Sequence, residues 1–438
     1  MSERAHPSHR ARRILIRGGH LIDPVDGFSG KADLLIEGDH IAARDRPGAI
    51  PAQGADVIEA AGELVVPGLI DMHVHLREPG FEYKETIATG GLSAVVGGIT
   101  SVACMPNTDP VNDNAAVTQY IIEKARRAGL ANVFPVGAVS VGLQGKQLAE
   151  FGEMVEAGIV AVSDDGMPIM DANLMRRALE YARMFGLVVI VHEEDTALCC
   201  GGAMNEGVVS AQLGLPGLPA VGESAMVARD IEIARYTRGR LHIAHLSTAE
   251  SVEHVRRAKA DGLEVTAEAS PHHFTLDETA CEGYNTNAKM YPPLRTARDV
   301  QALREGLADG TIDTIATDHA PHHRDEKSVH FEDAARGIVG LETLLPLSLA
   351  LVRDSVMTME QLVAALTIAP AKNLGIERGS LAVGAVADVT VIDPEREWAL
   401  DAGELASKSK NTPFDGWTLK GKATRTIVGG RSVWGEDR

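Results

Sequence analysis

Two histidines separated by one residue, His73 and His75, end an apolar and β-prone segment in the run PGLIDMHVHLREPG, residues 67–80. Because strand side chains alternate between faces, both imidazoles project from the same side. Two converging imidazoles suit a divalent metal such as zinc, which takes nitrogen and carboxylate ligands and lowers the pKa of a bound water to about 7. The pair alone is also compatible with a structural role, in which one histidine packs in the core and the other is exposed. Further candidate ligands are needed to distinguish the two interpretations.

Short apolar, β-branched runs alternate with helical stretches after this segment. We expect seven more strands, at 99–104, 133–136, 159–162, 187–191, 241–244, 263–267 and 312–316. Helices are expected between them, including 115–128, 174–185, 223–236 and 250–260. Eight β/α units predict an α/β fold of the (β/α)8 TIM-barrel type rather than an open doubly wound sheet.

Both ends of the chain consist of short strand-like runs separated by glycine and proline. They predict a small discontinuous β-sandwich domain built from residues 14–66 and 380–438, with the barrel at 67–379. The first residues, 1–13, are basic and lack the apolar segment of a signal peptide, so we expect a disordered tail.

Composition narrows the class of partner. The 438 residues carry 61 acidic and 42 basic side chains, a formal charge of −19. This balance argues against a nucleic acid or an anionic membrane and favours a small-molecule substrate. The four cysteines show no paired framework, which fits a cytoplasmic location, and no apolar run approaches the roughly 20 residues needed to span a bilayer.

In a (β/α)8 barrel the catalytic residues follow the C-terminal ends of the strands. Histidines and carboxylates stand at five of these ends in this chain, and they form a nitrogen and oxygen set suited to one or two zinc ions. The set is His73, His75, Asp164 or Asp165, His192, His245 and Asp318. Pattern alone leaves open which of the adjacent aspartates faces the barrel mouth. His242 is expected to pack, and His272 and His273 are not counted as ligands.

Three residues at or near these strand ends suggest specific roles. Asp318 follows the last strand and can act as the general base that metal-assisted hydrolysis requires. Arg77 lies on the same projected side as His75 and can form a bidentate pair with a substrate carboxylate, although a surface ion pair is the plain alternative. Asn107 can offer its amide to the same carboxylate, although Pro-Asn is also common in turns.

The motifs resemble those of the cyclic amidohydrolases, and within them the bacterial class I dihydroorotases, over essentially the whole chain. The resemblance rests on PGLIDMHVHLREPG (67–80), CMPNT (104–108), SDDGMPIMD (163–171), VHEED (191–195), HIAHLST (242–248), PPLR (292–295), ATDHAPH (316–322), GIVGLET (337–343) and KSKNTPF (408–414). It implies the reversible cyclisation of N-carbamoyl-L-aspartate to L-dihydroorotate in pyrimidine synthesis.

The same resemblance implies a role for each matching residue. The implied metal ligands are His73, His75, Asp165, His192, His245 and Asp318. Asp318 would also shuttle the proton, while Arg77, Asn107 and His322 would contact the substrate. The chain departs from the family at Tyr291, where many members carry asparagine before Pro-Pro-Leu-Arg. A phenol cannot copy the paired donor and acceptor of an amide, so either the backbone binds the substrate there or specificity differs.

Two alternatives remain at this stage. Hydantoinases, dihydropyrimidinases and allantoinases are similar overall but commonly place a carboxylated lysine on strand four, where this chain has Ser163-Asp164-Asp165; only Tyr291 favours them. A non-catalytic dihydroorotase-like subunit of an aspartate carbamoyltransferase complex would be marked by missing ligands, and none is missing. The resemblance also implies a homodimer, association with aspartate carbamoyltransferase as a further option, and one or two zinc ions per subunit.

Overall fold

The computed structural model describes residues 12–436 and contains a parallel barrel of eight strands. The strands are β6 (Leu69–Val74), β7 (Ile99–Cys104), β8 (Asn132–Gly137), β9 (Ala161–Ser163), β10 (Val188–Val191), β13 (Arg240–Ile243), β14 (Val265–Ala269) and β15 (Thr314–Ile315). They lie side by side in chain order. A parallel β-bridge between Val74 and His319 closes the barrel. At this bridge the backbone N–H of His75 donates to the His319 carbonyl at 2.9 Å. The predicted barrel is confirmed.

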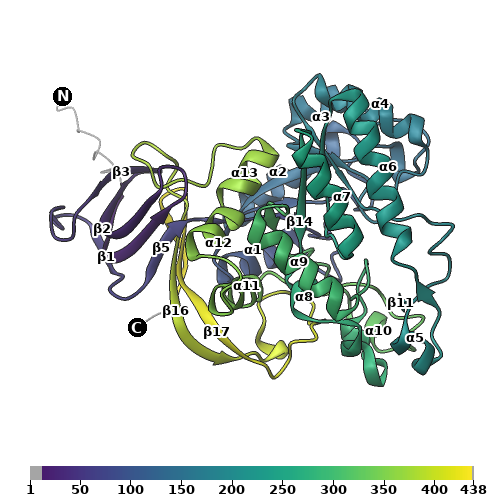
Figure 1. Ribbon diagram of the computed structural model, residues 1–438. Coiled ribbons are helices and arrows are strands. Elements are labelled where there is room, and N and C mark those ends of the chain that lie inside the picture. The colour runs from purple at the N-terminus through teal and green to yellow at the C-terminus, as the bar shows by residue number, and fades with distance from the viewer. Residues whose placement is uncertain (1–11, 437–438) are drawn as a thin grey trace.

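Helices surround the barrel and cover its outer face (Figure 1). They are α1 (Ile87–Val96), α2 (Ala115–Ala128), α3 (Phe151–Ala157), α4 (Ala172–Arg183), α6 (Val221–Thr237), α7 (Ala249–Ala260), α9 (Ala297–Asp309), α11 (Leu344–Arg353), α12 (Met359–Leu366) and α13 (Ile368–Leu374). Three shorter helices lie in loops: α5 (Val208–Leu213), α8 (Pro271–Thr275) and α10 (Arg324–Lys327). Each of the four expected helices is present.

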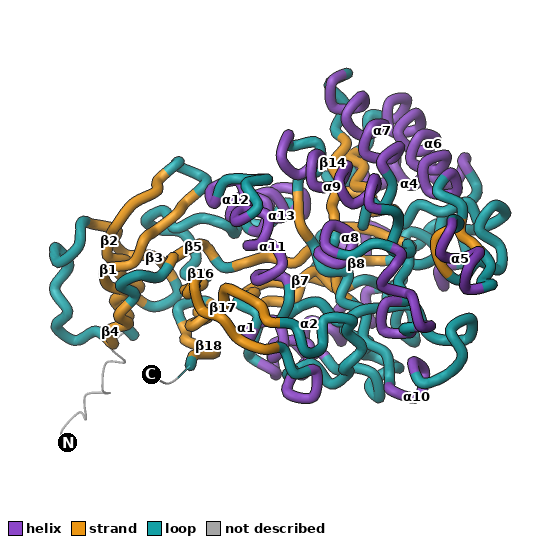
Figure 2. The backbone as a smooth tube through the Cα atoms, turned by 60° about the horizontal axis from the view of Figure 1, so that its bottom comes forward, coloured by secondary structure: helices purple, strands orange, loops and turns teal. Residues whose placement is uncertain are grey.

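Strands from both ends of the chain form a second sheet, which lies at one end of the molecule (Figure 2). Its members are β1 (Arg13–Asp23), β2 (Phe28–Glu37), β3 (His40–Asp45), β4 (Asp56–Glu59), β5 (Leu64–Pro67), β16 (Val389–Ala399), β17 (Thr418–Val428) and β18 (Arg431–Gly435). Strand β5 joins the two ends, since it pairs with both β1 and β16. Residues 1–11 of the tail expected at 1–13 lie outside the described residues, and Arg13 already belongs to β1.

Buried polar contacts fix this sheet against the barrel. The Asp388 carboxylate accepts from Asn132 Nδ2 of β8 at 2.9 Å and from the Gly429 N–H at 2.7 Å, and it pairs with Arg378 Nε at 2.8 Å. Thr390 Oγ1 donates to the Gly98 carbonyl at 2.6 Å. Because the Asp388 and Thr390 side chains are buried, these contacts hold the two sheets in a fixed relative position.

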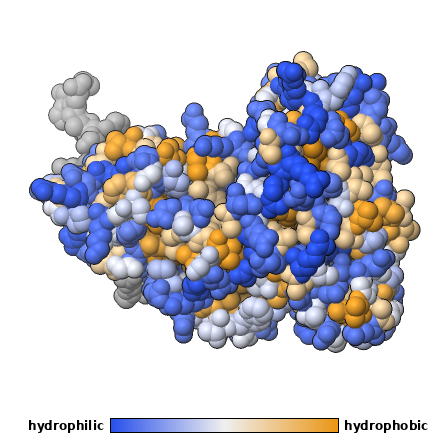
Figure 3. Space-filling model, viewed as in Figure 1, coloured by the Kyte–Doolittle hydropathy of each residue, from blue (hydrophilic) through white to orange (hydrophobic). Residues whose placement is uncertain are grey.

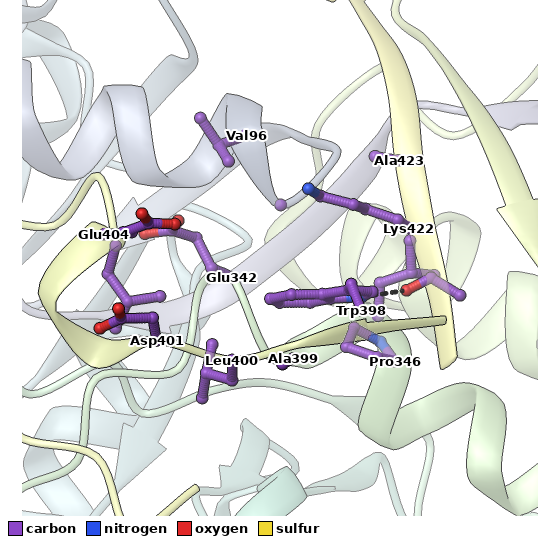
Figure 4. Close-up of a pocket in the computed structure, with 14 residues that line it drawn as sticks. Val96, Glu342, Pro346, Trp398, Ala399, Leu400, Asp401, Glu404, Lys422 and Ala423 are labelled. Atoms are coloured by element: carbon purple, nitrogen blue, oxygen red, sulfur yellow. Dashed lines mark hydrogen bonds between the residues drawn. The ribbon is translucent and has the colours of Figure 1, made fainter. Parts of the chain in front are cut away.

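A cavity of about 210 Å³ lies where β16 and β17 meet α1 and α11. Figure 4 shows the acidic side chains Glu342, Asp401 and Glu404 at one end and Trp398 with Lys422 at the other. None of the predicted site residues lines this cavity. The chemistry predicted from the sequence therefore belongs to another part of the molecule.

Hydrophilic side chains cover much of the face seen in Figure 3, and apolar side chains are scattered among them. Across the described residues, the helices are all too short or too polar to cross a bilayer.

The Asp388 contacts generate a stability prediction. Asp388→Ala should lower the free energy of unfolding by about 1–3 kcal/mol, because it leaves the partly buried donors of Asn132, Gly429 and Arg378 without their acceptor. Chemical denaturation followed by circular dichroism measures this change. Glu395→Ala is the control, since the Glu395 side chain is 77% exposed in its ion pair with Lys420 and its loss should leave the free energy of unfolding nearly unchanged. Equal losses in the two variants would contradict the proposed anchoring.

Candidate active site

The predicted site residues meet at the C-terminal mouth of the barrel, around a cavity of about 180 Å³. The predicted residues that line it are His75, Arg77, Asn107, Asp165, His192, His245, Tyr291, Asp318 and His322. His73 is fully buried, and its Nε2 lies 3.3 Å from the Asp165 carboxylate. Gly166, Met290, Ala320 and Arg336 complete the lining.

Asp165 lies among four imidazoles. Its Oδ1 is 3.3 Å from His73 Nε2, 3.6 Å from His245 Nε2 and 3.9 Å from His192 Nδ1. Its Oδ2 is 3.5 Å from His75 Nε2. The neighbouring Asp164 points elsewhere, since its Oδ1 accepts from the Ser140 N–H at 2.9 Å. Of the two adjacent aspartates, it is therefore Asp165 that faces the mouth.

Asp318 approaches the same histidines from the end of the last strand. Its Oδ1 lies 3.0 Å from His75 Nε2 and 3.6 Å from His73 Nε2. Ligand atoms of the cluster fall into three overlapping groups, each within 4.8 Å: His73, His245 and Asp318; His73, His75 and Asp165; and Asp165, His192 and His245.

The donor set of this cluster fits a metal. His73 Nε2 and Asp165 Oδ1 are buried, and neither makes a hydrogen bond. A buried polar atom without a partner costs free energy, so such atoms need an explanation. A cation between them would provide the missing partner, and imidazole nitrogens with carboxylate oxygens are ligands of the type that zinc binds. The cluster is therefore compatible with a metal site.

Glu268, on β14, does not line the cavity but contacts the histidines from inside the barrel. His73 Nδ1 lies 2.5 Å from Glu268 Oε1, and the His245 N–H donates to the same oxygen at 3.2 Å. His242 Nε2 lies 3.1 Å from Glu268 Oε2, away from the cavity. Because the carboxylate accepts a hydrogen bond from the Nδ1–H of His73, that tautomer directs the lone pair of Nε2 toward Asp165. Asn107 Oδ1, 2.9 Å from His75 Nδ1, does the same for His75.

Electrostatics keep the carboxylates of the cluster ionised. Burial alone would raise the pKa of Asp165, but the imidazoles of His73, His245 and His75 hold the pKa well below its ordinary value. Burial likewise opposes ionisation of Asp318, and His73 and His75 outweigh it, so the pKa of Asp318 is also lowered. The cluster therefore offers anionic oxygens at neutral pH, the state in which carboxylates bind cations.

Three residues of the site have backbone conformations that side chains other than glycine rarely adopt. The φ angles are +60° at Arg77, +32° at His245 and +47° at Asp318. Such conformations cost about 1–3 kcal/mol each and cluster at functional sites. The sequence gives no signal for them.

The loop after β15 brings His322 and Arg77 together. Arg77 Nε donates to the Pro321 carbonyl at 3.2 Å, and the His322 N–H donates to Asn411 Oδ1 at 3.0 Å. His322 Nε2 lies 2.9 Å from the Arg336 carbonyl. Burial, with Arg77 and Lys84 nearby, lowers the pKa of His322 to about 3, so the ring is neutral at physiological pH.

The sequence prediction missed Glu268 and Arg336 as residues of the site. A carboxylate inside the otherwise apolar strand β14 was an available signal for Glu268. Arg336 directly precedes the motif GIVGLET but is not part of it. His272 and His273 are buried and do not line the cavity; His273 Nε2 lies 2.9 Å from the Pro292 carbonyl.

Comparisons with known proteins show the family to which the chain belongs. A family model described as dihydro-orotase-like matches residues 62–251, and one described as amidohydrolase family matches residues 225–434. The dihydroorotase of Pelobacter propionicus is 57% identical over 421 residues, covering 96% of this chain and 99% of the relative. That of Geobacter sulfurreducens is 58% identical over 420 residues, with the same coverage of both proteins.

Solved structures share the architecture. The L-hydantoinase (dihydropyrimidinase) from Arthrobacter aurescens superposes with a TM-score of 0.87 at 26% identity, covering 97% of this chain and 96% of that chain. The D-hydantoinase (dihydropyrimidinase) from a Thermus species gives 0.81 at 26% identity, covering 97% of each. Because the identity to dihydroorotases is high over nearly the full length, the chain belongs to the dihydroorotase family of the amidohydrolases.

Proposed function

We propose that this protein is a zinc-dependent dihydroorotase that interconverts N-carbamoyl-L-aspartate and L-dihydroorotate in pyrimidine biosynthesis. The observation that carries the proposal is the convergence of four imidazoles and two carboxylates on one cavity that Arg77 and Asn107 also line. A cluster of candidate metal ligands beside a guanidinium matches a substrate that carries both an amide to be hydrolysed and a carboxylate to be bound.

One or two zinc ions per subunit would be held by His73, His75, Asp165, His192, His245 and Asp318, whose ligand atoms form three overlapping groups. Asp165 lies within 4 Å of all four imidazoles and belongs to two of these groups. When bound, zinc lowers the pKa of water and polarises the carbonyl under attack. The carboxylates of Asp165 and Asp318 would offset the positive charge of the bound metal.

Asp318 has the position of a general base. In the hydrolytic direction, a water attacks the ring amide carbonyl of dihydroorotate, and the Asp318 carboxylate accepts a proton from that water. The same carboxylate then returns the proton to the ring nitrogen as the amide bond breaks, which gives the acyclic product. The biosynthetic direction reverses these steps.

Arg77 and Asn107 would hold the substrate carboxylate. The Asn107 Oδ1 atom is used by His75, which leaves the Nδ2 donor for the substrate. Arg77 keeps a terminal nitrogen for a charge-assisted hydrogen bond while Nε donates to Pro321. His322 would contact the same ligand from the loop after β15.

The alternatives have less support. Asp165 takes the place after β9 where hydantoinases and dihydropyrimidinases commonly carry a carboxylated lysine. A non-catalytic subunit would lack part of the ligand set, whereas every proposed ligand is present.

The proposal extends to assembly and location. We expect a cytoplasmic homodimer, and association with aspartate carbamoyltransferase where that enzyme is present. Light scattering of the purified protein measures its oligomeric state, and the same measurement on a mixture with aspartate carbamoyltransferase tests the association. A monomer at micromolar concentration would contradict the dimer.

The first prediction about activity concerns the substrate. Zinc-loaded protein should open L-dihydroorotate with a kcat/KM about 10- to 150-fold above that for dihydrouracil, since dihydrouracil lacks the carboxylate that pairs with Arg77. Hydantoin and allantoin should be turned over more slowly still. Preferential turnover of any of these rings would contradict the proposal and favour a sister activity, while silence on all four would favour a non-catalytic subunit.

The second prediction concerns Asp318. Asp318→Asn keeps an oxygen ligand but cannot carry the proton, so kcat should fall about 100- to 10,000-fold while zinc content stays near that of the unchanged protein. The matched control is Asp325→Asn, because the Asp325 side chain is 87% exposed on the following loop. A near-normal kcat in Asp318→Asn would remove the residue from the proton-transfer role.

The third prediction concerns Glu268. Glu268→Gln removes the carboxylate that fixes the His73 tautomer, so zinc affinity should fall about 10- to 100-fold, measured by competition with a chelator. Glu264→Gln, at an exposed position just before the same strand, serves as the control. Unchanged zinc affinity in Glu268→Gln would show that the His73 orientation does not depend on Glu268.

A further inference from the structure

Arg336 and Tyr291 form a paired wall of the substrate cavity. The Arg336 guanidinium lies 4.1 Å from the centroid of the Tyr291 ring, within the range of a cation–π contact. His192 also lies against that ring, with ring centroids 5.0 Å apart. Both Arg336 and Tyr291 line the cavity that holds the candidate metal ligands.

Arg336 is held at two further points. One terminal nitrogen donates to the Gly202 carbonyl at 2.7 Å, in the segment just before β11 (Met204–Asn205). Its own backbone carbonyl is 2.9 Å from His322 Nε2. The Arg336 guanidinium is therefore held in place by the Tyr291 ring, by the Gly202 carbonyl and by the loop that carries His322.

Most of the hydrogen-bonding capacity of this guanidinium is unused. An arginine has five N–H donors and no acceptor, and Arg336 forms a side-chain hydrogen bond only to Gly202 among the described residues. It forms no ion pair with any carboxylate in that part of the chain. A half-buried cation with free donors at the edge of a cavity is suited to bind an electron-rich oxygen of a ligand.

The Tyr291 side chain contributes its ring rather than its hydroxyl. Within residues 12–436, the hydroxyl has no hydrogen-bond partner, whereas the ring contacts both His192 and Arg336. This arrangement accounts for a phenol at a position where an amide would otherwise contact the ligand. The tyrosine provides a surface on which the guanidinium rests, and the guanidinium provides the donors.

We propose that Arg336 is a substrate-binding residue that determines specificity, and that Tyr291 positions it. This inference rests on the proposed function. Arg77 and Asn107 take the substrate carboxylate, and the metal cluster takes the reacting amide, so the group left for Arg336 is the ureide carbonyl between the two ring nitrogens. A guanidinium has hydrogen-bond donors and no acceptor. Arg336 therefore favours ligands that carry an acceptor oxygen at the position of the ureide carbonyl.

The experiment measures KM and kcat for L-dihydroorotate in zinc-loaded variants whose zinc content and thermal unfolding match those of the unchanged protein. Arg336→Gln should raise KM about tenfold or more with little change in kcat, because the lost interaction is made equally in the ground and transition states. Tyr291→Leu should raise KM about 3- to 10-fold, whereas Tyr291→Phe, which keeps the ring, should stay within about twofold.

A double variant separates positioning from independent binding. If Tyr291 acts through Arg336, Tyr291→Leu should add no further loss in the Arg336→Gln background. Arg336→Lys should recover only part of the affinity, since an ammonium rests less well on the ring and lacks the planar fork.

Three results would overturn the inference. They are a KM within twofold of normal in Arg336→Gln, an equal loss in Tyr291→Phe and Tyr291→Leu, and multiplicative losses in the double variant. Failure of the proposed function is distinguishable, because in that case the unchanged protein would not turn over dihydroorotate at all.

Discussion

The burial of three carboxylates, Asp165, Glu268 and Asp318, among imidazoles at the barrel mouth is the constraint on which the rest of the structure depends. Removing an ionised carboxylate from water costs several kcal/mol, and the cost is offset only by well-placed opposite charges and hydrogen bonds. Glu268 obtains these from His73, His242 and the His245 backbone. Asp165 is less well compensated, since its Oδ1 atom has no hydrogen-bond partner. A bound cation would provide the missing interaction.

The barrel and the outer sheet were predictable because their signals are local. Most barrel strands are short and largely apolar runs, and histidine or aspartate lies at or just after the ends of β6, β9, β10, β13 and β15. Helix α2 agrees at both ends with the prediction because its boundaries are coded by single residues: the Asn114 side chain accepts from the N–H groups of Ala116 and Val117, and Gly129 ends the helix with a φ of +63°. Strand ends then placed the candidate ligands on one face of the barrel.

The parts that could not be predicted depend on contacts between distant segments. Glu268 lies 195 residues from His73 in the chain, and Arg336 meets Gly202 across 134 residues, so no spacing rule connects either pair. Pattern reasoning also left Asp164 and Asp165 equivalent, because only the three-dimensional position of Ser140 shows where Asp164 finds its partner. Tyr291 was visible as a departure from the family, but its contact with Arg336 was not.

If the cluster around Asp165 holds metal, crystals of zinc-loaded protein should show it directly. Anomalous diffraction at the zinc absorption edge should give at least one peak enclosed by the side chains of His73, His75, Asp165, His192, His245 and Asp318. A protein that turns over dihydroorotate while its crystals give no anomalous peak among these side chains would contradict a metal-binding role of the cluster.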